Sequence, residues 1–583
     1  STRVRSSAAS DVYKRQGEPL PGCAVKIKGT ATGVVTNVDG EFVIRTKEGD
    51  VLEISYLGYV TKEIEIGKVR ILSVTLQEDA QKLEEVVITA FGSGQKKESI
   101  TGAIQSVKPA DLKVPSANLS NSFAGRLSGV VAYQRSGEPG SNGSNFYIRG
   151  ISTLSGVTDP LIVMDGVEIS TADLNAIDPE VIESFSILKD ATATAMYGTR
   201  GANGVMIIKT KSGADLEKPV IGFRVEAYVN QPTQVPEFVD GVTYMKMYNE
   251  AVTNQGTGAV LFTQAQMNGV ANGLDPYIYP NVDWYNEIFT NLTFNQKANF
   301  NIRGGTEKIT YFMNLSMNHE TGMLQNNSNK YYSYNNNIDL KKYAFQNNID
   351  FNLSKTSKIA LHLNVQLNDY TGPYNSVDNI FTQIMNNNPV DYPISFPNTL
   401  NDGDWVHWGS YNGGNEQGAA NPMAYATQGY NDYTESTVIA NIDFDQKLDF
   451  ITKGLSFKAL FSFKNWSYTS TSRYQSYNKY YLKGYSQNAD GSYNYDISAM
   501  GEPSRHSMTT SNSTTGDRKF YFQSYFNYDR TFADAHNVSG MLLWNLEQYD
   551  SNAPSSLISS LPQRKMGFAA RLAYDYKHRY MLE

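Results

Sequence analysis

Ten segments between residues 220 and 576 alternate apolar and polar residues with a period of two, and this pattern constrains the fold more than any other feature of the chain. In one of them, Leu361, Leu363 and Val365 alternate with His362 and Asn364. A period of two places successive side chains on opposite faces of a strand, and each segment reaches the roughly 9–11 residues that a tilted strand needs to cross a bilayer. We therefore expect membrane-spanning strands with one face toward lipid and the other toward a polar interior. The segments are 220–229, 294–303, 308–318, 345–354, 358–369, 437–450, 455–468, 518–532, 536–549 and 565–576.

The connections between these segments are short and long in turn. An outer-membrane barrel has this topology, because tight periplasmic turns alternate with long external loops. A soluble sandwich has no reason to keep every second connection long. The short turns are 304–307, 355–357, 451–454 and 533–535, and the long connections are 230–293, 319–344, 370–436, 469–517 and 550–564.

Ten strands are fewer than a closed, plugged barrel needs, since such barrels have about 22. The last residues, Tyr580 to Glu583, have the character of the start of an eleventh strand. An open strand edge is not tolerated in lipid. We therefore expect this chain to be an N-terminal fragment, with over half of the barrel and the signal peptide absent.

Composition and scattered histidines argue against a nucleic-acid-binding protein or an enzyme. The net charge is −8, and the six histidines form no H-E-x-x-H pair that would bind zinc. No G-x-S-x-G nucleophile elbow occurs. Asp443 and Asp445 could imitate the carboxylate pair of a glycosidase, but acids that face a polar barrel interior explain them more simply. We expect no catalytic residue, metal or cofactor.

The region before the barrel divides into several parts. Residues 1–16 show neither an apolar run nor alternation, so we expect a foreign or disordered segment there. Short β-rich runs separated by glycines over 17–78 predict a small β-sandwich. Cys23, the single cysteine, excludes an internal disulfide, and no apolar run precedes it as a lipidation signal requires. Residues 79–95 are a linker.

The most specific motif is FSILKDATATAMYGTRGANGVMIIKTK, at residues 185–211. It predicts an apolar run, a small-residue helix over 191–197, a glycine-rich turn over 198–204 and a strand over 205–210. Together with GEPLPG, TNVDGEF and ISYLGY near the start, LEEVVITA in the linker, and SFAGRLSGV, FYIRG and PLIVMDGV beyond it, this motif resembles the SusC/RagA family of TonB-dependent outer-membrane transporters.

This resemblance implies a mainly β protein with four parts. They are a carboxypeptidase-regulatory-like β-sandwich (17–78), a linker with a TonB box (79–95), an α/β plug (96–213), and the N-terminal part of an incomplete antiparallel transmembrane β-barrel (214–583). In the family a further strand precedes the GEPLPG position, so the resemblance implies that this sandwich lacks its first strand or carries a poor substitute for it. An extended TonB box can add as a strand to a partner's sheet, and it has no evident strand partner within the linker. The alternative is an ordinary edge strand. The implied box is Glu84, Glu85, Val86, Val87, Ile88, Thr89 and Ala90, and the implied plug motif is Arg149, Asp165, Lys189, Asp190, Tyr197, Gly198, Arg200, Gly201, Asn203 and Gly204.

The implied function is energy-coupled import of a nutrient, either an oligosaccharide or a peptide, across the outer membrane of a Bacteroidetes-type Gram-negative bacterium. The implied partners are TonB with its inner-membrane energising complex, a SusD-like lipoprotein lid, and outer-membrane lipid. A surface receptor or adhesin that binds glycan or protein without transport is the alternative, although an adhesin needs no coupling segment. In the external loop 370–436, aromatic and polar side chains suit contact with cargo or lid, with loop packing as the alternative: Trp405, His407, Trp408 and Tyr411.

Overall fold

The computed structural model contains two compact units, residues 1–88 with 94–100 and residues 89–93 with 101–583, and we describe each unit by itself. The structure describes residues 6–13, 23–28, 33–37, 41–47, 49–56, 61–66, 71–76, 86–88, 94–96, 104–151, 156, 158–189, 194–216, 218–256, 258, 260–325, 327–411, 419–533, 535–577 and 580–582.

The first unit contains a small β-sandwich. Its sheets have the orders β4-β1-β7 and β3-β2-β5-β6, and Val25, Ile54 and Leu52 are buried between them. Cys23 lies in the same core, where its Sγ contacts the carbonyl oxygen of Ser55 at 3.4 Å, and burial raises the pKa of this thiol to about 11. The strands are β1 (Ser6–Tyr13), β2 (Ala24–Ile27), β3 (Gly33–Val35), β4 (Glu41–Thr46), β5 (Val51–Ser55), β6 (Lys62–Glu65) and β7 (Ile71–Thr75).

Strand β1 corrects one expectation from the sequence. Residues 1–16 were expected to lie outside the fold, but Ser6–Tyr13 pairs antiparallel with β4 and parallel with β7. The expectation relied on side-chain alternation, whereas pairing uses the N–H and C=O groups that every non-proline residue carries. The open edges of β4 and β7 can therefore be satisfied by a segment without a strand-like side-chain pattern.

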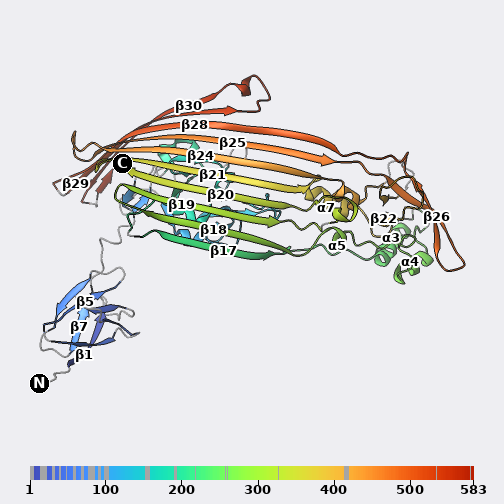
Figure 1. Ribbon diagram of the computed structural model, residues 1–583, viewed down its shortest axis with the longest axis horizontal. Coiled ribbons are helices and arrows are strands. Elements are labelled where there is room, and N and C mark those ends of the chain that lie inside the picture. The colour runs from blue at the N-terminus through green and yellow to red at the C-terminus, as the bar shows by residue number, and fades with distance from the viewer. Residues whose placement is uncertain are drawn as a thin grey trace. The chain divides into compact units, whose positions relative to one another are not determined.

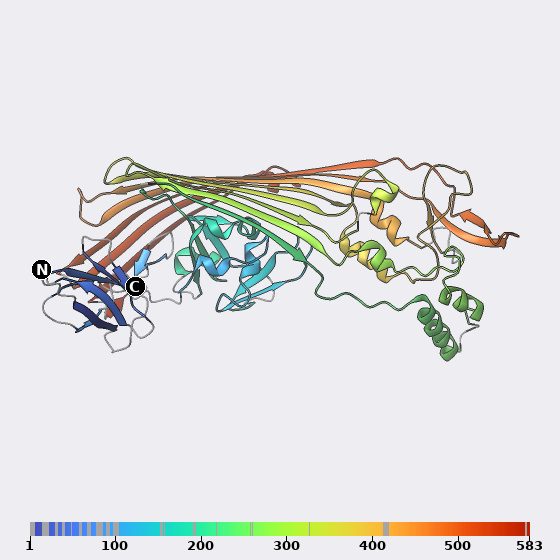
Figure 2. The same cartoon turned by 60° about the horizontal axis from the view of Figure 1, so that its bottom comes forward.

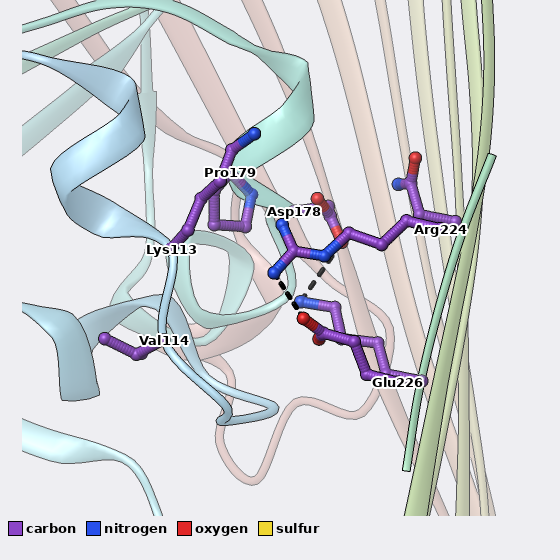
Figure 3. A pocket seen from close by; sticks show the side chains of 8 residues that line it. Lys113, Val114, Asp178, Pro179, Arg224 and Glu226 are labelled. Atoms are coloured by element: carbon purple, nitrogen blue, oxygen red, sulfur yellow. Dashed lines mark hydrogen bonds and ion pairs between the residues drawn. The ribbon is translucent and has the colours of Figure 1, made fainter. Parts of the chain in front are cut away.

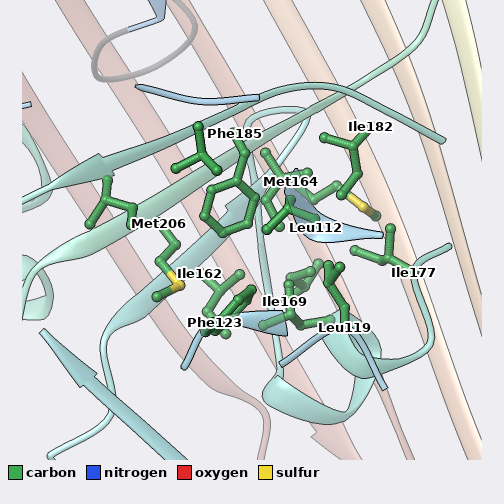
Figure 4. Packing of buried hydrophobic residues seen from close by; sticks show 14 of the residues in the cluster. Leu112, Leu119, Phe123, Ile162, Met164, Ile169, Ile177, Ile182, Phe185 and Met206 are labelled. Atoms are coloured by element: carbon green, nitrogen blue, oxygen red, sulfur yellow. The ribbon is translucent and has the colours of Figure 1, made fainter. Parts of the chain in front are cut away.

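The plug in the second unit is built on a five-stranded sheet with the order β10-β15-β16-β13-β14. Its central strands β13 and β16 contain continuous apolar runs because both of their faces are covered. Phe123, Phe185 and Ile182 lie in the core of the plug (Figure 4). The predicted strand over 205–210 is confirmed as β16. The predicted helix over 191–197 is helical where it is described: Thr194 is α-helical, and the residues after it belong to a 3-10 helix, η6. The plug elements are β10 (Ile104–Val107), η3 (Pro109–Leu112), η4 (Leu119–Ser122), β11 (Val130–Gln134), β12 (Ser144–Ile148), β13 (Leu161–Met164), β14 (Val167–Ile169), α1 (Thr171–Asn175), η5 (Pro179–Val181), β15 (Ile182–Leu188), η6 (Ala195–Gly201) and β16 (Val205–Thr210).

All ten predicted barrel strands are present, joined in chain order into one antiparallel sheet (Figure 1). The predicted start of an eleventh strand is confirmed as β31, which pairs with β30. Figure 2 shows the sheet curving around the plug, which lies against its concave face. The strands are β17 (Val220–Asn230), β18 (Thr293–Gly305), β19 (Ile309–Thr321), β20 (Asp339–Asn352), β21 (Ser357–Pro373), β24 (Gly429–Lys447), β25 (Leu455–Tyr474), β28 (Thr509–Phe532), β29 (His536–Ser551), β30 (Gln563–Tyr576) and β31 (Tyr580–Leu582).

Several strands continue beyond their predicted bounds on the side of the long connections. β25 was expected to end near residue 468 but reaches Tyr474, and β28 was expected to start near 518 but starts at Thr509. The added residues are mostly Ser, Thr, Asn and Tyr. Outside the hydrocarbon region no apolar face is required, so alternation cannot mark these extensions.

The long connections carry the helices and a second small sheet, β22-β23-β26-β27. In the described residues, no helix is long and apolar enough to cross a membrane. These elements are α3 (Gly241–Gln255), α4 (Gln264–Ala271), α5 (Trp284–Ile288), α6 (Ser328–Tyr331), α7 (Val377–Met385), β22 (Ser395–Phe396), β23 (His407–Gly409), α8 (Pro422–Thr427), β26 (Lys479–Gln487), β27 (Tyr493–Ala499) and η7 (Ile558–Ser560).

Candidate functional site: the plug, its contacts with the barrel wall, and the external loops

The glycine-rich turn of the plug motif is packed too closely for side chains. A Cβ added at Gly204 would lie 2.7 Å from Cδ1 of Ile148, and the φ of Gly204 is +87°. A Cβ at Gly201 would lie 3.0 Å from Cβ of Thr194, and Gly198 breaks η6 with a φ of +59°. Glycine is therefore required at Gly198 for the backbone angle, at Gly201 for lack of space, and at Gly204 for both reasons.

The other residues of this turn have structural roles in the plug. Tyr197 is buried, and the side-chain amide of Asn203 donates a hydrogen bond of 3.4 Å to a backbone carbonyl of the plug. Arg200 forms an ion pair of 2.8 Å with Glu168 on β14. Asp190 lies outside the described residues.

Asp165 fixes the end of the plug sheet next to the barrel. With Gly166 it forms the turn between β13 and β14, where both residues have positive φ, +47° and +84°, as a tight hairpin turn requires. Its carboxylate accepts hydrogen bonds from the backbone N–H of Thr210 (2.9 Å) and from the Thr210 hydroxyl (2.6 Å). Nδ1 of His362, on barrel strand β21, lies 3.5 Å from the same carboxylate.

A ladder of buried amide side chains on β20 and β21 continues from this point. These are the polar residues that the sequence pattern assigned to the barrel interior, and the structure confirms that they face the plug. The hydrogen bonds run from Asn348 Nδ2 to Thr210 Oγ1 (2.7 Å) and to the Lys211 carbonyl (2.7 Å), from Gln346 Nε2 to Asn348 Oδ1 (2.5 Å), from Asn364 Nδ2 to Gln346 Oε1 (2.8 Å), from Gln366 Nε2 to Asn364 Oδ1 (3.0 Å), and from Gln366 Nε2 to the Asp173 carbonyl (3.3 Å).

Ion pairs form a second set of contacts between plug and wall. In three of the four pairs the acid belongs to the plug, in α1 or at η5, and the sequence did not single these acids out; in the fourth, the plug supplies the arginine and β29 supplies the acid. The only sequence signal for such an ion pair was a lysine on the polar face of a barrel strand. Sequence alone could not distinguish a lysine that contacts the plug from a lysine that is solvated. The pairs are Asp173 with Lys464, Asp178 with Lys297 (3.2 Å), Glu180 with Arg224 (3.6 Å), and Arg200 with Glu547 (3.9 Å).

Glu180 contacts three cations, and Figure 3 shows two of them, Lys113 and Arg224, beside Asp178. Besides Arg224, it pairs with Lys113 and with Lys211, the latter at 3.7 Å. Burial alone would raise the pKa of Glu180, but the hydrogen bond from Lys113 and the charges of all three cations hold this pKa below its ordinary value. Glu180 therefore joins two segments of the plug to the first barrel strand.

The predicted coupling segment lies in the first unit and is described only in its centre. Val86–Ile88 forms strand β8, which pairs antiparallel with β9 (Gly94–Lys96), so that Val87 faces Gln95. The expectation that this segment lacks a strand partner nearby is wrong, because β9 follows it closely in the chain. Glu84, Glu85, Thr89 and Ala90 lie outside the described residues.

The aromatic residues predicted to contact cargo or lid are mainly used for packing among the external loops. His407 and Trp408 are both 1% exposed. His407 Nε2 lies 2.9 Å from the Asp402 carboxylate, and its ring stacks on Tyr480 at 4.0 Å. The indole N–H of Trp405 donates to the Tyr480 hydroxyl at 2.6 Å. Of the four candidates, Tyr411 is the one with a largely exposed side chain, at 45%.

A cavity of about 1090 Å³ lies where the plug meets the external loops. Its lining includes the plug loop 134–139, the end of β17, and three aromatic side chains. Of these, Phe289 contacts both Tyr285 and Phe381. Glu138 and Asp378 also line it. A space of this size with aromatic walls and a few polar groups is typical of a ligand-binding cavity.

A curved antiparallel sheet that carries an α/β plug on its concave face defines a plugged outer-membrane receptor. The TonB-dependent receptor plug domain matches residues 96–205, and the CarboxypepD_reg-like domain matches residues 11–88. The TonB-dependent receptor SusC of Bacteroides thetaiotaomicron is 28% identical over 75% of this chain and 42% of its own length. A TonB-dependent receptor of Formosa agariphila is 27% identical over 99% of this chain and 52% of its own.

The fold comparison agrees with these matches. The structure of the RagAB peptide importer in the "open-open" state superposes with a TM-score of 0.61 at 18% identity, over 84% of this chain and 54% of the importer chain. The chain thus spans about half the length, or less, of the relatives it matches. Its plug domain, its CarboxypepD_reg-like domain and its fold are those of SusC/RagA-type TonB-dependent receptors, outer-membrane proteins of Bacteroidetes-type Gram-negative bacteria. As the sequence indicated, this is a class of receptors and not of enzymes.

Proposed function

We propose that this chain forms the plug and part of the barrel of an importer that takes up an oligosaccharide or a peptide with energy supplied through TonB. The proposal rests on the combination of two features: a plug that is bound to the barrel wall, and a strand-forming segment that precedes this plug in the sequence. A plug that only closes the barrel needs no such segment. A SusD-like lipoprotein covering the external loops completes the proposed machine.

The cavity above the plug supports binding of cargo on the external side. The stacking surfaces of Phe289 and Phe381 suit sugar rings or peptide side chains, and the carboxylates of Glu138 and Asp378 supply hydrogen-bond acceptors. Tyr411, exposed on the loop layer, is the predicted contact residue that is open to a cargo or a lid.

Coupling is proposed to occur by strand addition of Val86–Ile88 to TonB. Strand addition depends on backbone N–H groups, which proline lacks. In the intact protein, Val87→Pro should leave cargo binding at the cell surface unchanged and abolish uptake, whereas Val87→Thr should behave like the natural protein. Uptake is measured with labelled cargo in cells, and surface binding with the same cargo in de-energised cells.

A matched control uses the facing strand. Gln95→Pro removes the backbone N–H of Gln95 on β9 but leaves every N–H of β8 in place, so uptake should persist. If correctly assembled Val87→Pro protein still takes up cargo, this segment is not the coupling element. The surface-receptor alternative, which predicts binding without uptake in the natural protein, would then gain support.

A further inference from the structure

The first strand of the plug is held differently from the rest of the plug. Among the described strands, β10 is an edge strand whose one neighbour is β15, through four residue pairs from Ile104↔Leu188 to Val107↔Phe185. It is also the first described plug element after the linker that carries the coupling segment. Any pull on that linker is therefore applied to β10 before it reaches the other strands of the sheet.

Barrel contacts are concentrated in other parts of the plug. The Asn142 amide donates to Glu320 at 2.6 Å, Lys342 donates to Asn118 at 3.1 Å, and α1, η5 and the end of β16 bind the wall as described above. Within the part of the chain that the structure describes, Ile104–Val107 makes no hydrogen bond or ion pair with a barrel strand. The hydrogen bonds of this strand are thus internal to the plug, although Val107 belongs to the hydrophobic cluster that also includes Phe312 and Ile439 of the barrel.

Lys189 supplies that attachment together with the β10–β15 ladder. It follows β15 directly, and its ammonium donates to the side-chain carbonyl of Gln105 on β10 (2.5 Å) and to the backbone carbonyl of Ser128 (2.6 Å). Gly129 lies beside the same ammonium, with 3.5 Å between its added Cβ and Nζ. Burial, and next the charge of Arg149, lower the pKa of Lys189, so this ammonium is partly removed from water where it forms these bonds.

We propose that Lys189 is a positioning residue that clasps β10 to the body of the plug, and that β10 is the part of the plug released when the linker is pulled. The inference rests on the proposed importer function. Charge-assisted hydrogen bonds are stronger than neutral ones, so the clasp adds resistance to an edge strand that, among the described residues, makes no hydrogen bond or ion pair with a barrel strand.

The first test measures amide hydrogen exchange in the intact protein in detergent, without cargo or TonB. Lys189→Met should accelerate exchange at Gln105 and Val107 by about tenfold or more, as expected for the loss of a charge-assisted hydrogen bond. Exchange at Ile207 and Ile208 on β16 should stay unchanged, and Lys189→Arg should restore protection of β10. Equal acceleration throughout the plug would show a general structural role and overturn the clasp.

The second test remains informative even if Lys189→Met does not fold. Ser106 faces Ser186 across β10 and β15, so Ser106→Cys with Ser186→Cys, in a Cys23→Ala background, can lock β10 with a disulfide. Oxidation should stop uptake while surface binding persists, and reduction should restore uptake. The matched control is Ser184→Cys with Lys209→Cys, which links β15 to β16 and should leave uptake unchanged in both redox states.

Uptake that continues through the oxidised β10 lock overturns the inference. The Val87→Pro variant then separates the two levels: if it still abolishes uptake, the importer stands and only the release of β10 is wrong. If neither the lock nor Val87→Pro affects uptake, the proposed coupling through the linker fails as well.

Discussion

Two neighbouring asparagines on β20 should respond in opposite ways to the same substitution. Asn348 faces the plug, is 1% exposed, and forms three hydrogen bonds through its amide. Asn347 faces the opposite side of the sheet, where its cross-strand neighbours are Met313 and Leu363. Within the described residues, Oδ1 of Asn347 is buried without a hydrogen-bond partner.

The expected magnitudes follow from these contacts. Asn348→Leu removes the partners of the Lys211 carbonyl and of Gln346 Nε2, and each buried polar group left unsatisfied costs about 1–3 kcal/mol. The predicted loss is therefore roughly 2–6 kcal/mol in the free energy of unfolding. Asn347→Leu leaves no hydrogen-bond partner unsatisfied and places an apolar side chain between apolar neighbours, so it should be neutral or stabilising.

Urea titration of the intact protein in detergent micelles or lipid vesicles provides the assay, with the folded fraction read from the mobility of unheated samples in gels. Asn348→Leu should lower the midpoint clearly, and Asn347→Leu should leave it unchanged or raise it. Equal losses in the two variants, or a larger loss at Asn347, would refute the assignment of strand faces and the role of the amide ladder.

Two further predictions concern the lipid face and the charged contact at Glu180. Leu363→Arg should cost roughly 2–4 kcal/mol because arginine at the bilayer midplane is unfavourable, and gel mobility of outer-membrane fractions would show this cost as reduced assembly. Leu363→Met should assemble normally. Normal assembly of the arginine variant would contradict the assignment of Leu363 to the lipid face, and with it the same assignment of Leu361, Val365, Leu542 and Trp544. The pKa of Glu180 is lowered in the folded protein, so its contribution to the free energy of unfolding is complete above the ordinary pKa of the carboxyl and is lost as the pH falls through the lowered pKa. Glu180→Gln should therefore make the free energy of unfolding less dependent on pH between these two pKa values. An unchanged dependence on pH would show that the ion pairs of Glu180 contribute nothing.

The barrel strands could be predicted from sequence because lipid imposes a chemical rule on every second residue. Leu542 is 59% exposed while its neighbours Met541 and Leu543 are buried, and this difference is what alternation encodes. The predicted plug motif likewise relied on glycines with a local steric cause, such as Gly204. The strand extensions of β25 and β28 lay outside the rule, since beyond the bilayer their side chains follow no such alternation.

The partners of the polar face could not be predicted in the same way. Asp173 and Lys464 are separated by 291 residues, and neither residue carries a local signal that names the other. The aromatic residues of the external loop 370–436, which were predicted to contact cargo or lid, show the same difficulty. Residue types that bind sugars also pack well against one another. His407 is buried against Tyr480 and Trp408 contacts Tyr331, and each of these partners lies in a different loop.

The two kinds of plug attachment suggest how one domain can close a barrel and still yield to a pull. Contacts of α1, η5 and β16 with the wall involve buried amides and ion pairs spread over several barrel strands, so removing this part requires many of them to break together. β10 is attached along one edge, and its pairs can separate one after another from the end nearest the linker. A force applied through the linker therefore meets the weaker attachment first, and the body of the plug can keep its place on the wall while its first strand leaves.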